Sequence, residues 1–126
     1  MYNIITINDY INGDPLHEQN LDEVLKLVKE IRISFPEKTI WLYTGYEWNS
    51  LMSKICQPTF QDEKFEHNRN IHMKRQKIIS NVDILVDGEY IDEQKDLTLA
   101  YRGSKNQHVI DVKQSLAQNK IVLYCD

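Results

Sequence analysis

The start of the chain carries a strand, a helix and a second strand, and this pattern most constrains the fold. Residues 3–7 form a short, largely apolar run that suits a buried strand of a parallel sheet. Residues 39–44 are rich in β-branched and aromatic side chains and predict a second strand, which Gly45 ends. Because residues 20–34 between them have helical periodicity, we expect a βαβ unit with a right-handed crossover.

The helix in this unit has a clear apolar face and clear ends. Its apolar side chains recur at helical spacing: Leu21, Val24, Leu25, Val28 and Ile31. Asn20 can cap its amino end, and Glu23 stands three residues later, where the acid of a capping box belongs. The pair Phe35-Pro36 ends the helix near Ser34.

The second strand alternates between two faces. Ile40, Leu42 and Thr44 lie on one face, and Trp41 and Tyr43 lie on the other. We expect Trp41 and Tyr43 to be packing residues.

The turn Asn12-Gly13-Asp14-Pro15-Leu16 joins the first strand to the helix. Ligands of α/β folds bind beyond the carboxyl ends of the strands, where this turn should lie. Gly13 allows a positive φ or a close approach of the backbone to a ligand, and Pro15 biases Asp14 toward an extended conformation. Asp14 could therefore meet a cationic group, or it could simply brace the turn.

The remainder of the chain continues the α/β pattern. The expected elements are a short helix within residues 46–59, a polar surface helix within residues 60–80, a strand at residues 82–88, a loop at residues 89–98, and a final pair of strands at residues 109–112 and 121–124. The turn-rich stretch of residues 102–107 could be crosslinked by its own side chains, or it could be a surface that meets a partner.

Composition excludes several classes of protein. The chain has 126 residues, 41% of them hydrophobic and 27% charged, which fits a single globular domain over residues 1–126. The formal net charge of −4 argues against nucleic-acid binding. No apolar run is long enough to span a membrane and no signal peptide is visible, so we expect a cytoplasmic protein.

The cysteines and histidines predict no metal site. Cys56 and Cys125 lie far apart and form no C-x-x-C pair, which suits unpaired thiols in a reducing compartment. His67 and His72 are five positions apart and do not share one helical face. A solvated basic helix is the simpler interpretation of that segment.

Three stretches in series resemble one family. They are Asn12-Gly13-Asp14-Pro15-Leu16, Ile40-Trp41-Leu42-Tyr43-Thr44-Gly45-Tyr46, and residues 82–88 continued by residues 96–107 and 109–112. Their order and spacing are similar to those of the activating proteins of anaerobic ribonucleoside-triphosphate reductase, which are small radical S-adenosylmethionine enzymes. The resemblance covers nearly the whole chain. It implies an α/β fold that is a partial parallel βα barrel of the radical S-adenosylmethionine type.

The resemblance also implies a chemistry. In the family, a C-x-x-x-C-x-x-C run holds a 4Fe-4S cluster that binds S-adenosylmethionine. Its reductive cleavage gives a 5′-deoxyadenosyl radical that takes a hydrogen from a glycine of the large reductase subunit, the implied partner. The family's Gly-Gly-Asp/Glu-Pro turn binds the methionine amino group, so the resemblance implies cofactor-binding roles for Asn12, Gly13, Asp14 and Pro15.

Two further residues resemble positions on the cofactor or substrate side. Thr44 and Asp87 stand at strand ends that face the same mouth of the expected barrel. Asp87 precedes Gly88 and could serve turn chemistry alone.

Two departures from the family pattern shape the expected function. Asn12 replaces the first glycine of the turn, and the cysteine run is absent, since Met1 falls just before the first strand. A cluster with one open iron needs three thiolates, which two distant cysteines cannot supply. We therefore expect a carboxyl-terminal portion of an activating protein, truncated at its amino terminus, with no catalytic or metal-binding residues and neither cofactor bound by this chain alone.

Two function hypotheses follow, and they leave open whether the chain is an enzyme. The first is an activase of anaerobic ribonucleotide reductase, or a remnant of one. The second is a non-catalytic binding module that docks on the reductase or on a copy of itself. An exposed sheet edge and exposed core surface would favour association, such as a homodimer, marginal stability or a rearranged amino-terminal segment.

Overall fold

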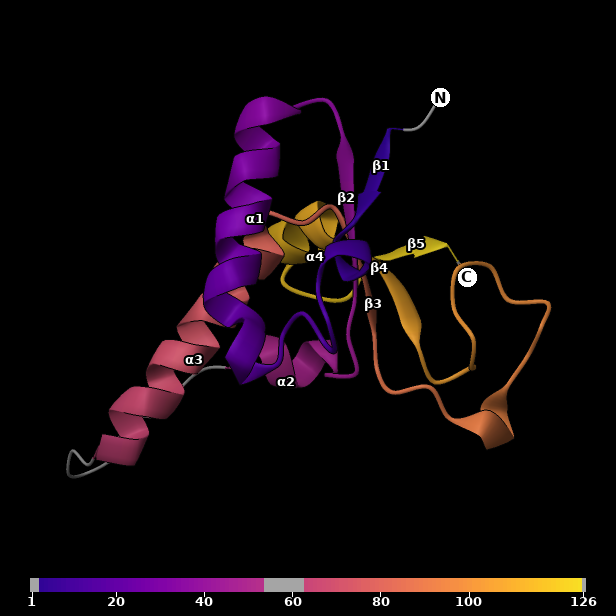
Figure 1. The fold of residues 1–126 in the computed structure, drawn as a ribbon. Helices are drawn as coiled ribbons and strands as arrows, with labels where there is room; N and C mark the ends of the chain where they lie inside the picture. The colour runs from indigo at the N-terminus through magenta and orange to yellow at the C-terminus, as the bar shows by residue number, and fades with distance from the viewer. Residues whose placement is uncertain (1–2, 54–62, 126) are drawn as a thin grey trace.

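The computed structural model describes residues 3–53 and 63–125, and its elements follow the expected order (Figure 1). They are β1 (Ile4–Thr6), α1 (Leu21–Ser34), β2 (Thr39–Tyr43), α2 (Trp48–Met52), α3 (Glu63–Ser80), β3 (Ile84–Asp87), β4 (His108–Asp111), α4 (Val112–Gln118) and β5 (Leu123–Cys125). Short 3-10 helices occur at Ile7–Tyr10, Glu18–Asn20 and Asp92–Gln94. The part of the expected second helix at residues 54–59 lies outside the described residues.

The five strands form one sheet in the order β1-β2-β3-β4-β5. The β1–β2 and β2–β3 pairs are parallel, whereas the β3–β4 and β4–β5 pairs are antiparallel. The α/β class is therefore confirmed, but the sheet is mixed, and the expected parallel arrangement covers only the first three strands. The reason is the connection from β3 to β4, which contains a 3-10 turn but no crossover helix and so returns the chain antiparallel.

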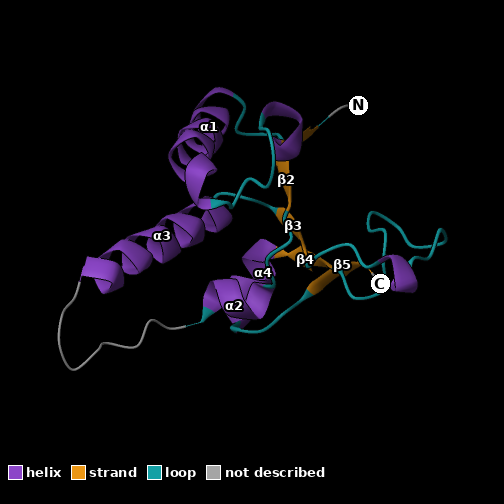
Figure 2. Ribbon diagram, turned by 60° about the horizontal axis from the view of Figure 1, so that its bottom comes forward, coloured by secondary structure: helices purple, strands orange, loops and turns teal. Residues whose placement is uncertain are grey.

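The described helices α1, α2, α3 and α4 lie on one side of the sheet (Figures 1 and 2). The apolar face of α1 packs into the core through Leu21, Val24, Val28 and Ile31, as its periodicity predicted. The expected alternation of β2 is also confirmed. Its side chains at positions 40 and 42 join this helix-side core, whereas those at positions 41 and 43 pack with a smaller cluster on the opposite face.

On the opposite face of the sheet, three aromatic side chains pack together. The ring centroid of Trp41 lies 5.0 Å from that of Tyr101 and 5.6 Å from that of Tyr124. Tyr101 belongs to the β3–β4 connection, which projects away from the helices in Figure 1. This long connection therefore partly covers the face that the helices leave open.

The predicted capping box at the start of α1 is wrong. The residues Glu18–Asn20 form a 3-10 turn that runs directly into α1, so Asn20 already has helical backbone angles and its side chain makes no cap hydrogen bond. Its amide instead donates to the carbonyl oxygens of Asn12 at 3.0 Å and Asp14 at 2.9 Å. Asn20 thus stabilises the preceding turn rather than the helix end.

The strand directions place several connections at one edge of the sheet. The carboxyl ends of the parallel strands β1, β2 and β3 meet there, and the antiparallel β4 begins there because Asp87 is paired with His108. Segments far apart in sequence are therefore brought together at this edge. Among the described residues, no helix is both long and apolar enough to cross a membrane.

Candidate functional site

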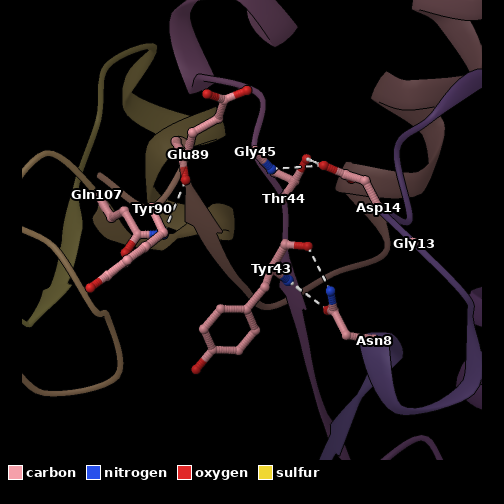
Figure 3. A pocket seen from close by; sticks show the side chains of 10 residues that line it. Asn8, Gly13, Asp14, Tyr43, Thr44, Gly45, Glu89, Tyr90 and Gln107 are labelled. Carbon is pink, nitrogen blue, oxygen red and sulfur yellow. Dashed lines mark hydrogen bonds between the residues drawn. The ribbon is translucent and has the colours of Figure 1, made fainter. Parts of the chain in front are cut away.

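A pocket of about 370 Å³ opens at this carboxyl edge (Figure 3). Its lining comes from the turn after β1, the end of β2 and the β3–β4 connection: Asn8, Gly13, Asp14, Tyr43, Thr44, Gly45, Gly88, Glu89, Tyr90 and Gln107. A volume of this size is within the usual range for small-molecule sites, roughly 300–1,000 Å³. The pocket therefore unites Gly13, Asp14 and Thr44, which the sequence had singled out.

The carboxylate of Asp14 joins the turn after β1 to the end of β2. Its Oδ1 accepts hydrogen bonds from the Leu16 amide at 2.9 Å and the Thr44 hydroxyl at 2.9 Å. Its Oδ2 accepts from the Gly45 amide at 2.8 Å. Figure 3 shows Asp14 reaching across to Thr44 and Gly45 in this way.

These donors leave Asp14 with little capacity for a ligand. A carboxylate offers about four acceptor positions, and the Thr44 hydroxyl also lies 3.1 Å from Oδ2. A ligand that displaced either amide would leave that N–H unsatisfied, at a cost of about 1–3 kcal/mol where it is shielded from water. Of the two roles predicted for Asp14, meeting a cationic group or bracing the turn, the hydrogen bonds of the structure show the bracing role.

Asn8 extends the pairing of β1 with β2 beyond the end of β1. Its amide group donates to the Tyr43 carbonyl at 2.9 Å, and its side-chain oxygen accepts from the Tyr43 amide at 2.8 Å. The side chain thus satisfies both backbone groups of a residue that has no strand partner on that side. Sequence analysis did not identify Asn8, because nothing local distinguishes it from any loop asparagine.

The other predicted residues differ in their relation to the pocket lining. Asn12 is exposed and Pro15 is buried, and neither contributes to the lining. Gly13 does line it and has φ +81°, as a glycine turn at that position allows. The Thr44 side chain lines the pocket but is occupied by Asp14.

Asp87 is an internal hydrogen-bond acceptor and is only 2% exposed. Its Oδ2 accepts from the Trp48 amide at 2.8 Å, and its Oδ1 accepts from the His108 amide at 3.0 Å and contacts His108 Nδ1 at 2.9 Å. It therefore pins the start of α2 and the start of β4 to the end of β3. Its neighbours Gly88 and Glu89 line the pocket, but Asp87 itself does not.

The turn at residues 102–107 is crosslinked by its own side chains, which was one of the two predicted roles. Arg102 Nη1 donates to the carbonyl oxygens of Lys105 and Gln107, and Gln107 Oε1 accepts from the amides of Gly103 and Ser104. Gln107 Nε2 donates to the Gly88 carbonyl at 3.0 Å. This network holds one wall of the pocket in place.

Arg75 of α3 connects the two other segments that form the pocket, the turn after β1 and the loop after β2. Its Nε donates to the Leu16 carbonyl at 2.8 Å, and its Nη2 donates to the Tyr46 hydroxyl at 3.1 Å. The guanidinium carbon also lies 4.4 Å from the Tyr46 ring centroid, a cation–π distance. One side chain thus links the turn after β1 to the loop after β2.

The charge of the lining is negative. Asp14 and Glu89 are its ionisable acids, and no lysine, arginine or histidine belongs to it. Burial, and then the neighbouring Tyr101, raises the pKa of the Tyr43 phenol. Desolvation, the hydrogen bond to Asp92 and the charge of Asp92 raise the pKa of Tyr90. Both phenols stay neutral near pH 7, so the pocket favours cationic ligands.

The described residues do not fit a metal cluster. Among residues 3–53 and 63–125, no group of three or more His, Cys, Asp or Glu side chains is placed to hold a metal ion. Cys125 is a free thiol, and Cys56 lies outside the described residues. His67 contacts Glu18, and His72 contacts the Ser53 carbonyl, each at 2.7 Å. Two cysteines cannot provide the three thiolates of a 4Fe-4S site.

Comparison with known families defines the class of protein. Residues 5–110 match the family model described as a 4Fe-4S single cluster domain. No solved structure matches the chain significantly.

Curated relatives define the family more closely. The chain is 36% identical over 97 residues to the anaerobic ribonucleoside-triphosphate reductase-activating protein of Escherichia coli K12, covering 77% of this chain and 50% of that protein. The protein of that name in Vibrio cholerae is 38% identical over 95 residues, covering 75% of this chain and 48% of its own length. The one in Enterobacteria phage T4 is 34% identical over 97 residues, covering 77% and 47%.

These matches confirm the resemblance. The chain belongs to the family of anaerobic ribonucleoside-triphosphate reductase-activating proteins. It spans about half the length of the curated relatives that it matches.

The bracing role of Asp14 can be tested by Asp14→Asn. The amide group cannot accept from both backbone N–H donors, so we expect the free energy of unfolding to fall by about 1–3 kcal/mol. Urea denaturation followed by circular dichroism measures this loss. Asp9→Asn is the matched control, because it makes the same chemical change in the same region at a residue that is exposed. Equal stability of the two variants would contradict the bracing role.

Proposed function

We propose that this chain acts as part of an activating protein for anaerobic ribonucleotide reductase and that its carboxyl-edge pocket receives S-adenosylmethionine. One observation carries the proposal. The turn with Gly13 and Asp14 and the end of β2 with Thr44 and Gly45, which are more than 25 residues apart, line the same pocket. Both stretches belong to the motifs that the family resemblance rests on.

The chemistry of the pocket supports this ligand. S-adenosylmethionine carries a sulfonium and an ammonium group, and the lining contains acids and neutral polar groups but no cation. Carboxylates and carbonyl oxygens are suitable partners for an ammonium group. Gly13 lines the pocket without a Cβ, and this absence also permits its positive φ. Asn12, Pro15 and Asp87 contribute to this proposal only by shaping the surrounding turns.

The proposal separates ligand binding from radical generation. Residues 5–110 of this chain match a family model described as a 4Fe-4S single cluster domain, yet the two cysteines of these 126 residues are too few for such a cluster. Reductive cleavage of S-adenosylmethionine and formation of a glycyl radical therefore need thiolates that this sequence does not contain. We propose that the 126-residue chain is inactive by itself. We also propose that a partial parallel βα barrel of the radical S-adenosylmethionine type needs strands beyond the three parallel ones of this sheet.

Binding of S-adenosylmethionine tests the first part. We expect titration calorimetry of the purified chain to detect binding and Thr44→Val to weaken it by about tenfold, which corresponds to about 1.4 kcal/mol. The physical reason is that Asp14 loses the Thr44 hydroxyl, one of the two donors after β2 that hold it, and keeps the Gly45 amide, which loosens the pocket. Thr98→Val is the control, since Thr98 lies on the β3–β4 connection away from the lining. If the wild-type chain gave no heat of binding, the proposal that the pocket receives S-adenosylmethionine would be wrong.

Anaerobic reconstitution with iron and sulfide tests the second part. We expect less than one cluster per chain and no stable visible absorption of a 4Fe-4S centre, because three thiolates are required. Iron and sulfide assays provide the measurement. Cys125→Ser is the matched control and should leave the result unchanged. A stoichiometric cluster that Cys125→Ser abolishes would show that the thiols of this chain suffice.

A second function, self-association, is favoured by the edge strand β1. Among the described residues β1 pairs only with β2, and Ile4 is 54% exposed. Beside it, a groove of about 280 Å³ between β1 and α1 is lined mainly by apolar side chains: Ile5, Tyr10, Leu27, Ile31 and Phe35, with Glu30 and Ser34. An unpaired edge next to an apolar groove is a suitable surface for another polypeptide.

Light scattering tests this second function. We expect the wild-type chain to have the mass of a dimer and Phe35→Glu to shift it toward the monomer, because a charge in the groove opposes apolar contact. Leu97→Glu is the control, since Leu97 is 88% exposed and lies on the β3–β4 connection. A wild-type monomer at all concentrations would contradict self-association.

A further inference from the structure

We infer that Glu89, rather than Asp14, supplies the negative charge that pairs with the cationic group of the ligand. The inference rests on the proposed function, because it concerns the same pocket. It assigns a binding role to a residue that follows β3 and lies outside the turn with which the family resemblance begins.

The first step concerns the availability of Asp14. Its two oxygens accept from the Leu16 amide, the Thr44 hydroxyl and the Gly45 amide. These donors come from both the turn after β1 and the end of β2, so they hold the carboxylate in one orientation. A ligand ammonium would have to replace one of them, and the freed backbone N–H would lose its partner.

The second step concerns the availability of Glu89. Its side chain is exposed and lines the pocket. Its carboxylate has no hydrogen bond or ion pair to another residue within the described part of the chain. Its backbone is nevertheless anchored, because Asn106 Nδ2 donates to the Glu89 carbonyl at 2.7 Å. Glu89 therefore combines a fixed backbone with a free charge.

The third step is the position of Glu89 relative to Asp14. A Cβ atom at Gly45 would lie 3.3 Å from Glu89 Cγ and 3.5 Å from Asp14 Oδ2. The two acidic side chains thus flank the same glycine, one on each side of the chain after β2, as Figure 3 shows. A cationic group bound beside Gly45 would have the free Glu89 side chain on one side and the hydrogen-bonded carboxylate of Asp14 on the other.

The fourth step is the absence of a competing charge. The other side chains in the lining, Asn8, Tyr43, Thr44, Tyr90 and Gln107, are neutral near pH 7. No cationic side chain belongs to the lining, so the charge of Glu89 is not neutralised within the pocket. An exposed charge pair of this kind is sensitive to salt, which gives the inference a specific signature.

Calorimetry with S-adenosylmethionine on the full chain tests the inference. Glu89→Gln keeps the shape of the side chain and removes its charge, and we expect binding to weaken about three- to tenfold at low salt, the range for a partly exposed pair. The affinity of the wild-type chain should fall as salt is raised, and that of Glu89→Gln should fall less. Thermal unfolding should be unchanged, because the carboxylate makes no described contact.

Glu93→Gln is the matched control. Glu93 is an exposed acid on the same connection, it does not line the pocket, and its substitution changes the net charge by the same amount. We expect wild-type affinity and wild-type salt dependence from it. Equal weakening by Glu93→Gln and Glu89→Gln would show a general effect of net charge and would overturn the inference.

A second variant tests the position of Glu89 without removing its charge. In Gly45→Ala the added methyl group would lie 3.3 Å from Glu89 Cγ, closer than an ordinary contact, so the Glu89 side chain must shift by a few tenths of an ångström. We expect Gly45→Ala to weaken binding in the wild-type background by more than it does in the Glu89→Gln background. Equal losses in both backgrounds would contradict the inference.

The outcomes separate this inference from the proposed function. If the wild-type chain does not bind S-adenosylmethionine, the proposed function fails and the inference fails with it. If the wild-type chain binds and Glu89→Gln binds within about twofold of it at low salt, the proposed function stands and the inference is overturned. A parallel titration with S-adenosylhomocysteine, which lacks the sulfonium charge, shows which cation Glu89 meets: an equal loss indicates the ammonium, and a loss for S-adenosylmethionine alone indicates the sulfonium.

Discussion

The pocket depends on the carboxylate of Asp14, which holds the turn after β1 against the end of β2. It accepts hydrogen bonds from a residue two positions later and from Gly45, 31 positions later. Parallel neighbouring strands have no direct connection at their carboxyl ends, because each chain leaves there for its crossover. A side chain that accepts backbone amides from both connections supplies that missing link. Arg75 adds a second link between these two connections by donating to the Leu16 carbonyl and the Tyr46 hydroxyl.

Asp87 serves the next junction of the sheet in the same way. Its buried carboxylate accepts the amides of Trp48 and His108, so it joins the ends of three further segments. Two acids at the carboxyl edge of the sheet therefore act as internal acceptors for backbone N–H groups, which would otherwise lack partners. Glu89 remains free at this edge: its Cγ lies beside Gly45, and its carboxylate has no partner among the described residues.

The fold also separates the two requirements of the family's chemistry. The carboxyl edge offers an acidic pocket suited to a cationic ligand, and this pocket is built entirely from residues of the chain. The 126 residues contain two cysteines, fewer than the three thiolates that a 4Fe-4S cluster with an open iron requires, and the described residues bring no group of three metal-binding side chains together. A test of the proposed ligand binding therefore does not depend on cluster assembly.

The sequence by itself determined the elements that depend on local periodicity. The apolar repeat of α1, the alternation of β2 and the positive φ of Gly13 follow from residue type and spacing, which the unfolded chain already has. Tertiary structure decided the rest. Asn20 ties the turn instead of capping α1, and Glu89 is free where Asp87 is not. These roles depend on partners that strand register and helix packing bring close from distant positions, so no local pattern encodes them. Tertiary structure also decided the mixed sheet, in which β4 pairs antiparallel with β3 after a connection that contains no crossover helix.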